Sequence, residues 1–269
     1  MVVKRHCYLY MNQIFKNFKI LHKLFNKNIQ SFGLTFPRSK YHFSGEALVS
    51  LANRGDEIAC SIVELAKKKE IYSGTILLRS LIEHQFRHTY IYSRALSEQS
   101  DVVGKDYILY LLEVELKSYA DALNRNDKIF LTKQTFSDRL AELPAIPELK
   151  NVTQKELDIV NAKFGIKNII SYLNSRPSAY GNGQNKYLQQ IIPLYSNYSS
   201  FVHGGPFGAS VFKKTKEDRK RLERDSLHLV RTAHNMSCTM VLNTMRLASL
   251  LNAQFIPTID KCEKLYAFI

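Results

Sequence analysis

Apolar residues recur at intervals of three and four along most of the chain, which is the period of a helix with one buried face. Between residues 46 and 69, for example, Ala47, Leu48 and Leu51 fall on one side of such a helix. Comparable patterns cover residues 75–96, 106–125, 155–173, 188–203 and 215–252. Alternating β-branched residues, which mark strands, are not found. The pattern predicts an all-α fold in which the helices form a bundle.

Residues with special backbone preferences mark the expected helix ends. Ser44 is a candidate N-cap for the first long pattern, and Thr153 with Glu156 forms a candidate capping box. The run Gly204-Gly205-Pro206 is expected to end the helix before it, because glycine favours C-terminal caps and proline does not continue a helix. Two more interruptions are expected, a kink or break at residues 54–56 and a loop over residues 174–186.

Positive charge is concentrated at the N-terminus. The chain has 38 Lys and Arg against 24 Asp and Glu, a formal net charge of +14. Residues 1–45 contain no acidic residue and eight basic ones, namely Lys4, Arg5, Lys16, Lys19, Lys23, Lys27, Arg38 and Lys40. Such a balance favours RNA or another polyanion as partner. The plain alternative is a basic tail that promotes solubility.

The N-terminal segment is also amphipathic, with Phe15, Phe18, Leu21 and Phe25 at helical spacing. Three interpretations are open: a helix docked on the body, an arm that binds nucleic acid or a partner protein, and a transit-peptide or membrane-surface segment. We predict two parts, a basic amphipathic N-terminal extension over residues 1–43 and an all-α domain over residues 44–269.

Cysteine spacing and hydropathy bear on the compartment. Cys7, Cys60, Cys238 and Cys262 are far apart and form no C-x-x-C pair. This spacing favours reduced thiols in the cytoplasm over a disulfide framework or a zinc ribbon. No uncharged apolar run reaches about 18 residues, so no membrane span is expected.

The segment LLRSLIEH places ionisable residues in an apolar helical pattern. Arg79, Glu83 and Arg87 lie at i, i+4 and i+8 along one edge of the apolar face. They form either a ladder of ion pairs within the helix or a site at which Arg79 holds an anion against a neighbouring helix. His84 and His88 lie one turn apart on another flank, without a third ligand nearby in sequence. We expect no metal and no cofactor.

A second segment, YSNYSSFVHGGP, ends a later helical pattern with a histidine. Ser196, Ser199, Ser200 and His203 share one stripe, because they lie at i, i+3, i+4 and i+7. At the C-terminal end of a helix the dipole favours the imidazolium form of His203, which could donate a proton to a leaving oxygen. The alternative is a histidine that satisfies the last carbonyl groups of the helix.

Together the two segments resemble the HEPN superfamily of α-helical nucleotide-binding proteins and ribonucleases. Arg79 and His84 match its arginine–x4–histidine signature. The chain is also similar to an uncharacterised bacterial branch related to HEPN, with L-R-S-x-x-E at Leu78 to Glu83 and Y-x-x-x-S-x-x-V-H at Tyr195 to His203. Two positions depart from the family pattern, Ser80 where ribonuclease members often carry Asn, Asp or His, and Ser196 where the branch carries arginine.

The resemblance implies RNA binding or a metal-independent endoribonuclease, in which the RNA 2′-OH attacks its own phosphate while histidine handles protons and arginine steadies the phosphorane. It also implies a toxin or an antiviral defence effector, with a site formed across a homo-oligomer. Because Arg79 and His84 are about 140° apart around a straight helix, we expect the catalytic site to combine Arg79, Glu83 and His203. The secondary candidates are His84, Ser199 and Tyr198.

A charged segment follows soon after His203. Residues 213–225 hold seven basic and four acidic residues. Lys213, Lys214, Arg219 and Arg221 are candidate contacts for RNA phosphates beside the site. The alternative is the solvated start of a helix.

Two other function classes remain open. A non-catalytic helical adaptor, which binds a protein partner, would use Arg79, Glu83 and His203 as a buried network that fixes packing. A nucleic-acid-binding module would use the basic N-terminus, and the same network would be structural.

Overall fold

The computed structural model describes residues 2–130, 146–176 and 184–266, and every regular element in these ranges is helical, so the predicted all-α fold is confirmed. The helices are α1 (Val2–Thr35), α2 (His42–Lys67), α3 (Ile71–Glu98), α4 (Val102–Lys105), α5 (Leu111–Phe130), α6 (Gln154–Lys163), α7 (Ile166–Ser175), α8 (Gln184–Val202), α9 (Pro206–Glu217), α10 (Arg219–Ser249) and α11 (Ile256–Tyr266). Three short turns complete the list: the π-helical η1 (Asp106–Tyr110), and the 3-10 helical η2 (Pro147–Leu149) and η4 (Ala253–Phe255). None of the helices in these ranges is long and apolar enough to span a membrane.

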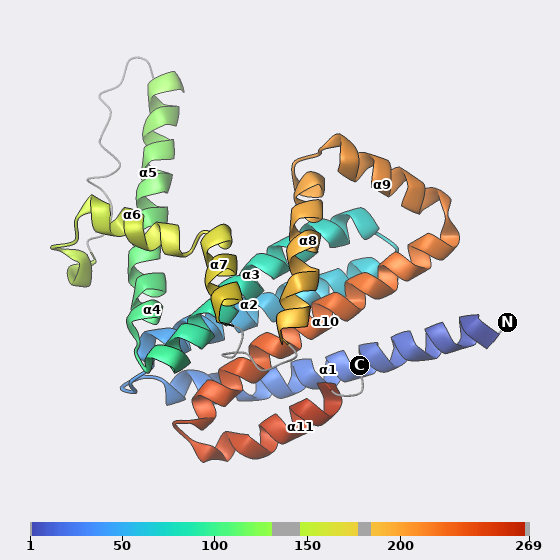
Figure 1. The fold of residues 1–269 in the computed structure, drawn as a ribbon, viewed down its shortest axis with the longest axis horizontal. Coiled ribbons are helices and arrows are strands. Elements are labelled where there is room, and N and C mark those ends of the chain that lie inside the picture. Colours follow the sequence, from blue (N-terminus) through green and yellow to red (C-terminus); the bar gives the residue numbers. More distant parts are fainter. Residues whose placement is uncertain (1, 131–145, 177–183, 267–269) are drawn as a thin grey trace.

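Three long helices, α2, α3 and α10, form the centre of the bundle (Figure 1). Their facing sides are filled by residues with no solvent exposure, such as Leu48, Ile62, Leu78, Ile82 and Met240. Helices α1 and α11 pack against α10, whereas α7 and α8 pack against α3. Helices α5 and α6 lie at one end of the bundle and α9 lies at the other (Figure 1). The segments that carry the candidate residues, α3 and α8, are therefore neighbours.

The second half of α1 is part of this core. Phe18, Leu21 and Phe25 are at most 7% exposed and belong to the same hydrophobic cluster as the central helices. Phe36, just after the helix, is buried as well. Of the three interpretations of the N-terminal segment, a docked helix describes residues 15–36. The domain boundary at residue 43 stays a prediction.

The start of α2 is capped from a distant part of the chain rather than by its own residues. The helix begins at His42, and the carboxylate of Asp101 accepts hydrogen bonds from the backbone N–H groups of Phe43 and Ser44, both at 2.7 Å. Gly104 makes this approach possible, because a Cβ there would lie 2.1 Å from the backbone nitrogen of Ser44. The expectation that Ser44 is the N-cap was therefore wrong, since a tertiary contact supplies the acceptor.

Two further expectations about helix ends hold. The capping box is confirmed: the backbone N–H of Glu156 donates to the Thr153 hydroxyl at 3.3 Å, and the backbone N–H of Thr153 donates to the Glu156 carboxylate at 2.8 Å. Helix α8 ends at Val202, before Gly204, which adopts a positive φ of 64°.

Other expected helix ends differ from the structure. The pattern over residues 155–173 is interrupted at Gly165, and that over residues 215–252 at Asp218, whose side chain caps α10. No break occurs at residues 54–56, because α2 continues through them and Gly55 lets Met240 of α10 approach. Residues 177–183 of the expected loop lie outside the described residues.

Candidate functional site between α3 and α8

Arg79 of α3 is held by two partners. Its Nη1 donates to Oε1 of Glu83 at 2.7 Å, and its Nη2 donates to the Tyr195 hydroxyl of α8 at 3.0 Å. The Tyr195 hydroxyl in turn donates to the same carboxylate oxygen at 3.1 Å. The guanidinium carbon also lies 4.6 Å from the centre of the Tyr195 ring, a cation–π geometry. Three side chains thus form a closed triangle that joins α3 to α8.

This triangle is largely shielded from solvent. The side chain of Arg79 is 18% exposed and that of Glu83 is 24% exposed. Burial, and then the neighbouring Glu83 carboxylate, raise the pKa of the Tyr195 phenol, so this group stays protonated and remains a donor. The arrangement fits an internal polar network better than an open anion site, because Arg79 already uses both terminal nitrogens.

His203 lies outside the triangle. It is exposed, in the turn after α8, and its backbone N–H donates to the Ser199 carbonyl at 3.1 Å. Helix α8 runs antiparallel to α3, since the Tyr72 hydroxyl at the start of α3 donates to the Phe201 carbonyl at 2.9 Å. Eight residues of helix, about 12 Å, separate His203 from Tyr195. The structure therefore brings Arg79 to Glu83 as expected, but the third member is Tyr195.

The secondary candidates are separated as well. His84 is half-buried and its Nδ1 bonds to the Ser80 carbonyl at 2.9 Å, while burial lowers its pKa. Ser199 is partly buried on α8. Tyr198 bonds through its hydroxyl to Nε2 of His228 at 3.2 Å. Of these three, Tyr198 lines a cavity.

That cavity, of about 260 Å³, lies between α3, α8, α9 and α10. Its apolar walls include Leu194, Phe201 and Phe212, and its polar lining is Thr75, Tyr198, Thr215, Arg221, Asp225 and His228. Burial raises the pKa of Tyr198 to about 12 and lowers that of His228. Asp225 accepts a hydrogen bond from Thr215 at 3.1 Å. The cavity therefore offers apolar surface, neutral hydrogen-bonding groups and one ion pair between Arg221 and Asp225.

The basic candidates next to this cavity are partly neutralised. Arg219 lies 3.5 Å from Glu223, and Arg221 lies 3.7 Å from Asp225. Lys213 is exposed, whereas the side chain of Lys214 lies outside the described residues. Arg219 and Arg221 lie on the start of α10, as one interpretation expected, whereas Lys213 lies near the end of α9.

An unpaired positive surface lies on α1. Lys16, Lys19, Lys23 and Lys27 are all exposed, and no carboxylate lies within ion-pair distance of them in the described ranges. At 100° per residue they fall within an arc of about 80°, and they extend over about 16 Å of helix. We call these four residues the α1 lysine stripe. Sequence reasoning recorded their charge but not that they share one solvent-facing side.

Comparisons with known proteins give no assignment. No family model matches this chain, and neither a curated protein nor a solved structure matches it. The resemblance to the HEPN superfamily accordingly stays a prediction based on the short motifs.

The contribution of Tyr195 to the triangle can be measured. Tyr195→Phe is expected to lower the free energy of unfolding by about 1 kcal/mol, because it removes a hydroxyl that bridges two part-buried groups and leaves the ring over Arg79 in place. Chemical denaturation measures the change. Tyr172→Phe is the matched control, since its hydroxyl accepts from the exposed Arg176 at 3.2 Å under a similar stacked geometry. Equal losses in both variants would contradict a special role for the buried triangle.

Proposed function

We propose that this protein binds RNA through the solvent-facing side of α1. The α1 lysine stripe carries the proposal, because it presents four unpaired cations on one side of a helix whose other side is fixed in the core. Lysines in such a row attract phosphate groups and release counterions on binding. RNA is preferred over other polyanions because of the resemblance to a superfamily of nucleotide-binding proteins.

The packing of α1 argues against a membrane surface as the partner. An interfacial helix inserts its apolar side between lipid headgroups and acyl chains. The apolar side of α1 is occupied, since Phe18, Leu21 and Phe25 are buried against the rest of the protein. Over residues 15–27 the exposed side of this helix carries the four lysines of the stripe, and such a row of charge suits phosphate contacts.

Endonucleolytic cleavage is a second candidate, favoured by the exposure of His203 at the end of α8. If the protein cleaves RNA, His203 would act with phosphate-binding groups other than Arg79, which is occupied by Glu83 and Tyr195. His203→Ala would then abolish cleavage without changing the melting temperature. The toxin or defence role and the homo-oligomer implied by the resemblance remain predictions that rest on this second candidate.

Replacing the four lysines of the stripe by glutamine tests RNA binding. With about 0.7 counterions released per phosphate of a single strand, four contacts give a slope of about −2.8 in a plot of log affinity against log salt. The contacts of the stripe should therefore make the RNA affinity of the natural sequence fall about 50-fold when salt rises from 50 to 200 mM. In the quadruple variant this contribution to the salt dependence of the affinity should be lost. Fluorescence anisotropy with a labelled single-stranded RNA measures both quantities.

The matched control replaces four exposed lysines elsewhere by glutamine, at positions 155, 167, 261 and 264. Net charge changes equally in the two variants, so a difference between them reports the location of the charge. Equal affinity and equal salt slope in both would refute binding at the stripe. Deletion of residues 1–43 is a poorer test, because it removes Phe18, Leu21 and Phe25 from the core.

A further inference from the structure

Three metal-ligating side chains that are far apart in the sequence meet where α1 lies against α2. His22 comes from α1, and Asp56 and Cys60 lie one turn apart on α2. Nδ1 of His22 bonds to Oδ2 of Asp56, and Sγ of Cys60 lies 3.7 Å from the same nitrogen. All three ligand atoms lie within 4.8 Å of one another. We propose that this cluster is a zinc site that clamps α1 to α2.

The separations suit one small ion. With Zn–N of about 2.0 Å and Zn–S of about 2.3 Å in a tetrahedral site, the nitrogen and sulfur should lie about 3.5 Å apart. The observed 3.7 Å between His22 and Cys60 is close to this value. For both groups to bind the same ion, Oδ2 of Asp56 has to move away from Nδ1 of His22 until these two atoms are about 3.3 Å apart. Asp56 and Cys60 are four residues apart on α2, so they project from the same side of that helix.

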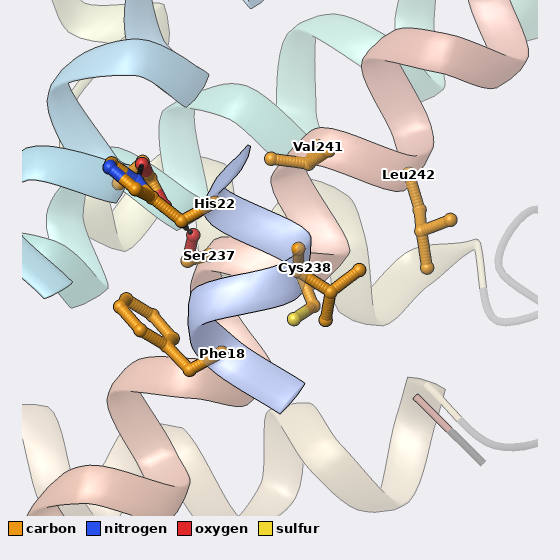
Figure 2. Close-up of a pocket in the computed structure, with 8 residues that line it drawn as sticks. Phe18, His22, Ser237, Cys238, Val241 and Leu242 are labelled. Atoms are coloured by element: carbon orange, nitrogen blue, oxygen red, sulfur yellow. Dashed lines mark hydrogen bonds and ion pairs between the residues drawn. The ribbon is translucent and has the colours of Figure 1, made fainter. Parts of the chain in front are cut away.

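Hydrogen bonds behind the ligands hold two of them in position. The hydroxyl of Ser237 on α10 donates to Oδ1 of Asp56 at 2.9 Å, which leaves Oδ2 directed at His22. The amide nitrogen of Asn26 donates to Nε2 of His22 at 2.9 Å, so Nδ1 faces the cluster and carries a ring proton, which zinc would displace on binding. Figure 2 shows His22 and Phe18 projecting from the same side of α1. Partners of this kind orient metal ligands.

The space at the cluster excludes a larger ligand. The adjoining cavity measures about 10 Å³, which is about the room of one water molecule. Apolar residues, among them Phe18, Val241 and Leu242, line the rest of it (Figure 2). The His22 side chain is 34% exposed, so solvent reaches one side of the cluster. An ion can approach from that side, and a water molecule can complete its coordination.

The donor set selects the metal. One thiolate, one imidazole and one carboxylate suit zinc, whereas calcium and magnesium prefer oxygen ligands alone. Zinc binds the thiolate form of cysteine, so binding at Cys60 displaces the thiol proton into solvent. The expectation of no metal rested on the spacing of the cysteines and on His84 and His88, and His22 is more than thirty residues from Asp56 and Cys60 in the chain.

Metal titration of the full-length protein under reducing conditions, after treatment with a chelator, tests the site. We expect one zinc ion per chain by calorimetry, and a thiolate-to-cobalt charge-transfer band when cobalt replaces zinc. The band and the zinc-dependent rise in melting temperature should be lost in Cys60→Ser and in His22→Gln, and kept in Cys262→Ala. Cys262 is a buried thiol outside the cluster, so it is the matched control.

Both substitutions fall on partly exposed side chains, so the variants are expected to fold, and circular dichroism confirms this before titration. Absence of stoichiometric binding to the natural sequence would overturn the proposal. The same conclusion follows if Cys60→Ser keeps the charge-transfer band or gains as much thermal stability from zinc as the natural sequence. The cluster would then be an ion pair between His22 and Asp56 that joins the two helices without a metal.

Discussion

Phe25→Ala is expected to lower the free energy of unfolding of the whole described bundle by about 4 kcal/mol. Phe25 lies on α1, has no solvent exposure, and is among the largest fully buried side chains. Its removal leaves a cavity between α1 and the central helices that neighbouring side chains cannot fill. For a chain of this size, a loss of this magnitude lowers the melting temperature by about 8–16 °C. Calorimetry or denaturation followed by circular dichroism measures the change.

The same variant tests where the folded domain begins. If α1 unfolds together with α2, α3 and α10, the single main transition should shift as a whole. If residues 1–43 are an independent extension, the main transition should stay where it is. Gln30→Ala is the control, since Gln30 is exposed on the same helix and its replacement should change stability by less than about 0.5 kcal/mol. A shift of the transition in Gln30→Ala as large as in Phe25→Ala would contradict the docking of α1 described above.

The fold class could be read from the sequence because helical periodicity is a local property. Apolar positions such as Leu48 and Leu51 lie in the core as their spacing predicts. Local end signals were also reliable where both partners are near in sequence, as in the capping box of Thr153 and Glu156. The start of α2 was mispredicted because its acceptor, Asp101, is nearly sixty residues away and reaches the helix only after α4 has packed.

In the candidate site, too, the local contact could be predicted from the sequence and the long-range contact could not. The pair of Arg79 and Glu83 follows from i, i+4 spacing on one helix. The choice of Tyr195 as third member depends on the register of α8 against α3, which is set by contacts such as that of Tyr72 with Phe201. Sequence motifs contain no information on that register, and so they could not distinguish Tyr195 from His203. The cluster of His22, Asp56 and Cys60 was missed for the same reason.

Acid should destabilise the protein through two buried histidines. His88 of α3 and His234 of α10 have no solvent exposure. Burial lowers the pKa of His88 from 6.5 to about 3 and that of His234 from 6.5 to about 4. In the unfolded chain both imidazoles are solvated and take up protons near their ordinary pKa of about 6.5. Below that pH the unfolded state binds more protons than the folded state, so the free energy of unfolding falls as pH falls.

Between pH 7 and pH 5 each of these two histidines should lower the free energy of unfolding by about 2 kcal/mol, about 4 kcal/mol together.

The variant His88→Gln isolates the contribution of one of the two histidines. Nε2 of His88 bonds to the Thr244 hydroxyl at 3.0 Å, and the amide of glutamine offers that hydroxyl a polar partner in place of the ring. The difference in unfolding free energy between pH 7 and pH 5, from denaturant titrations, should be about 2 kcal/mol smaller in this variant than in His203→Gln. That control also removes one imidazole, but from an exposed position. Equal differences in the two variants would mean that the His88 ring takes up its proton without unfolding, and that polar groups around the ring accommodate its charge.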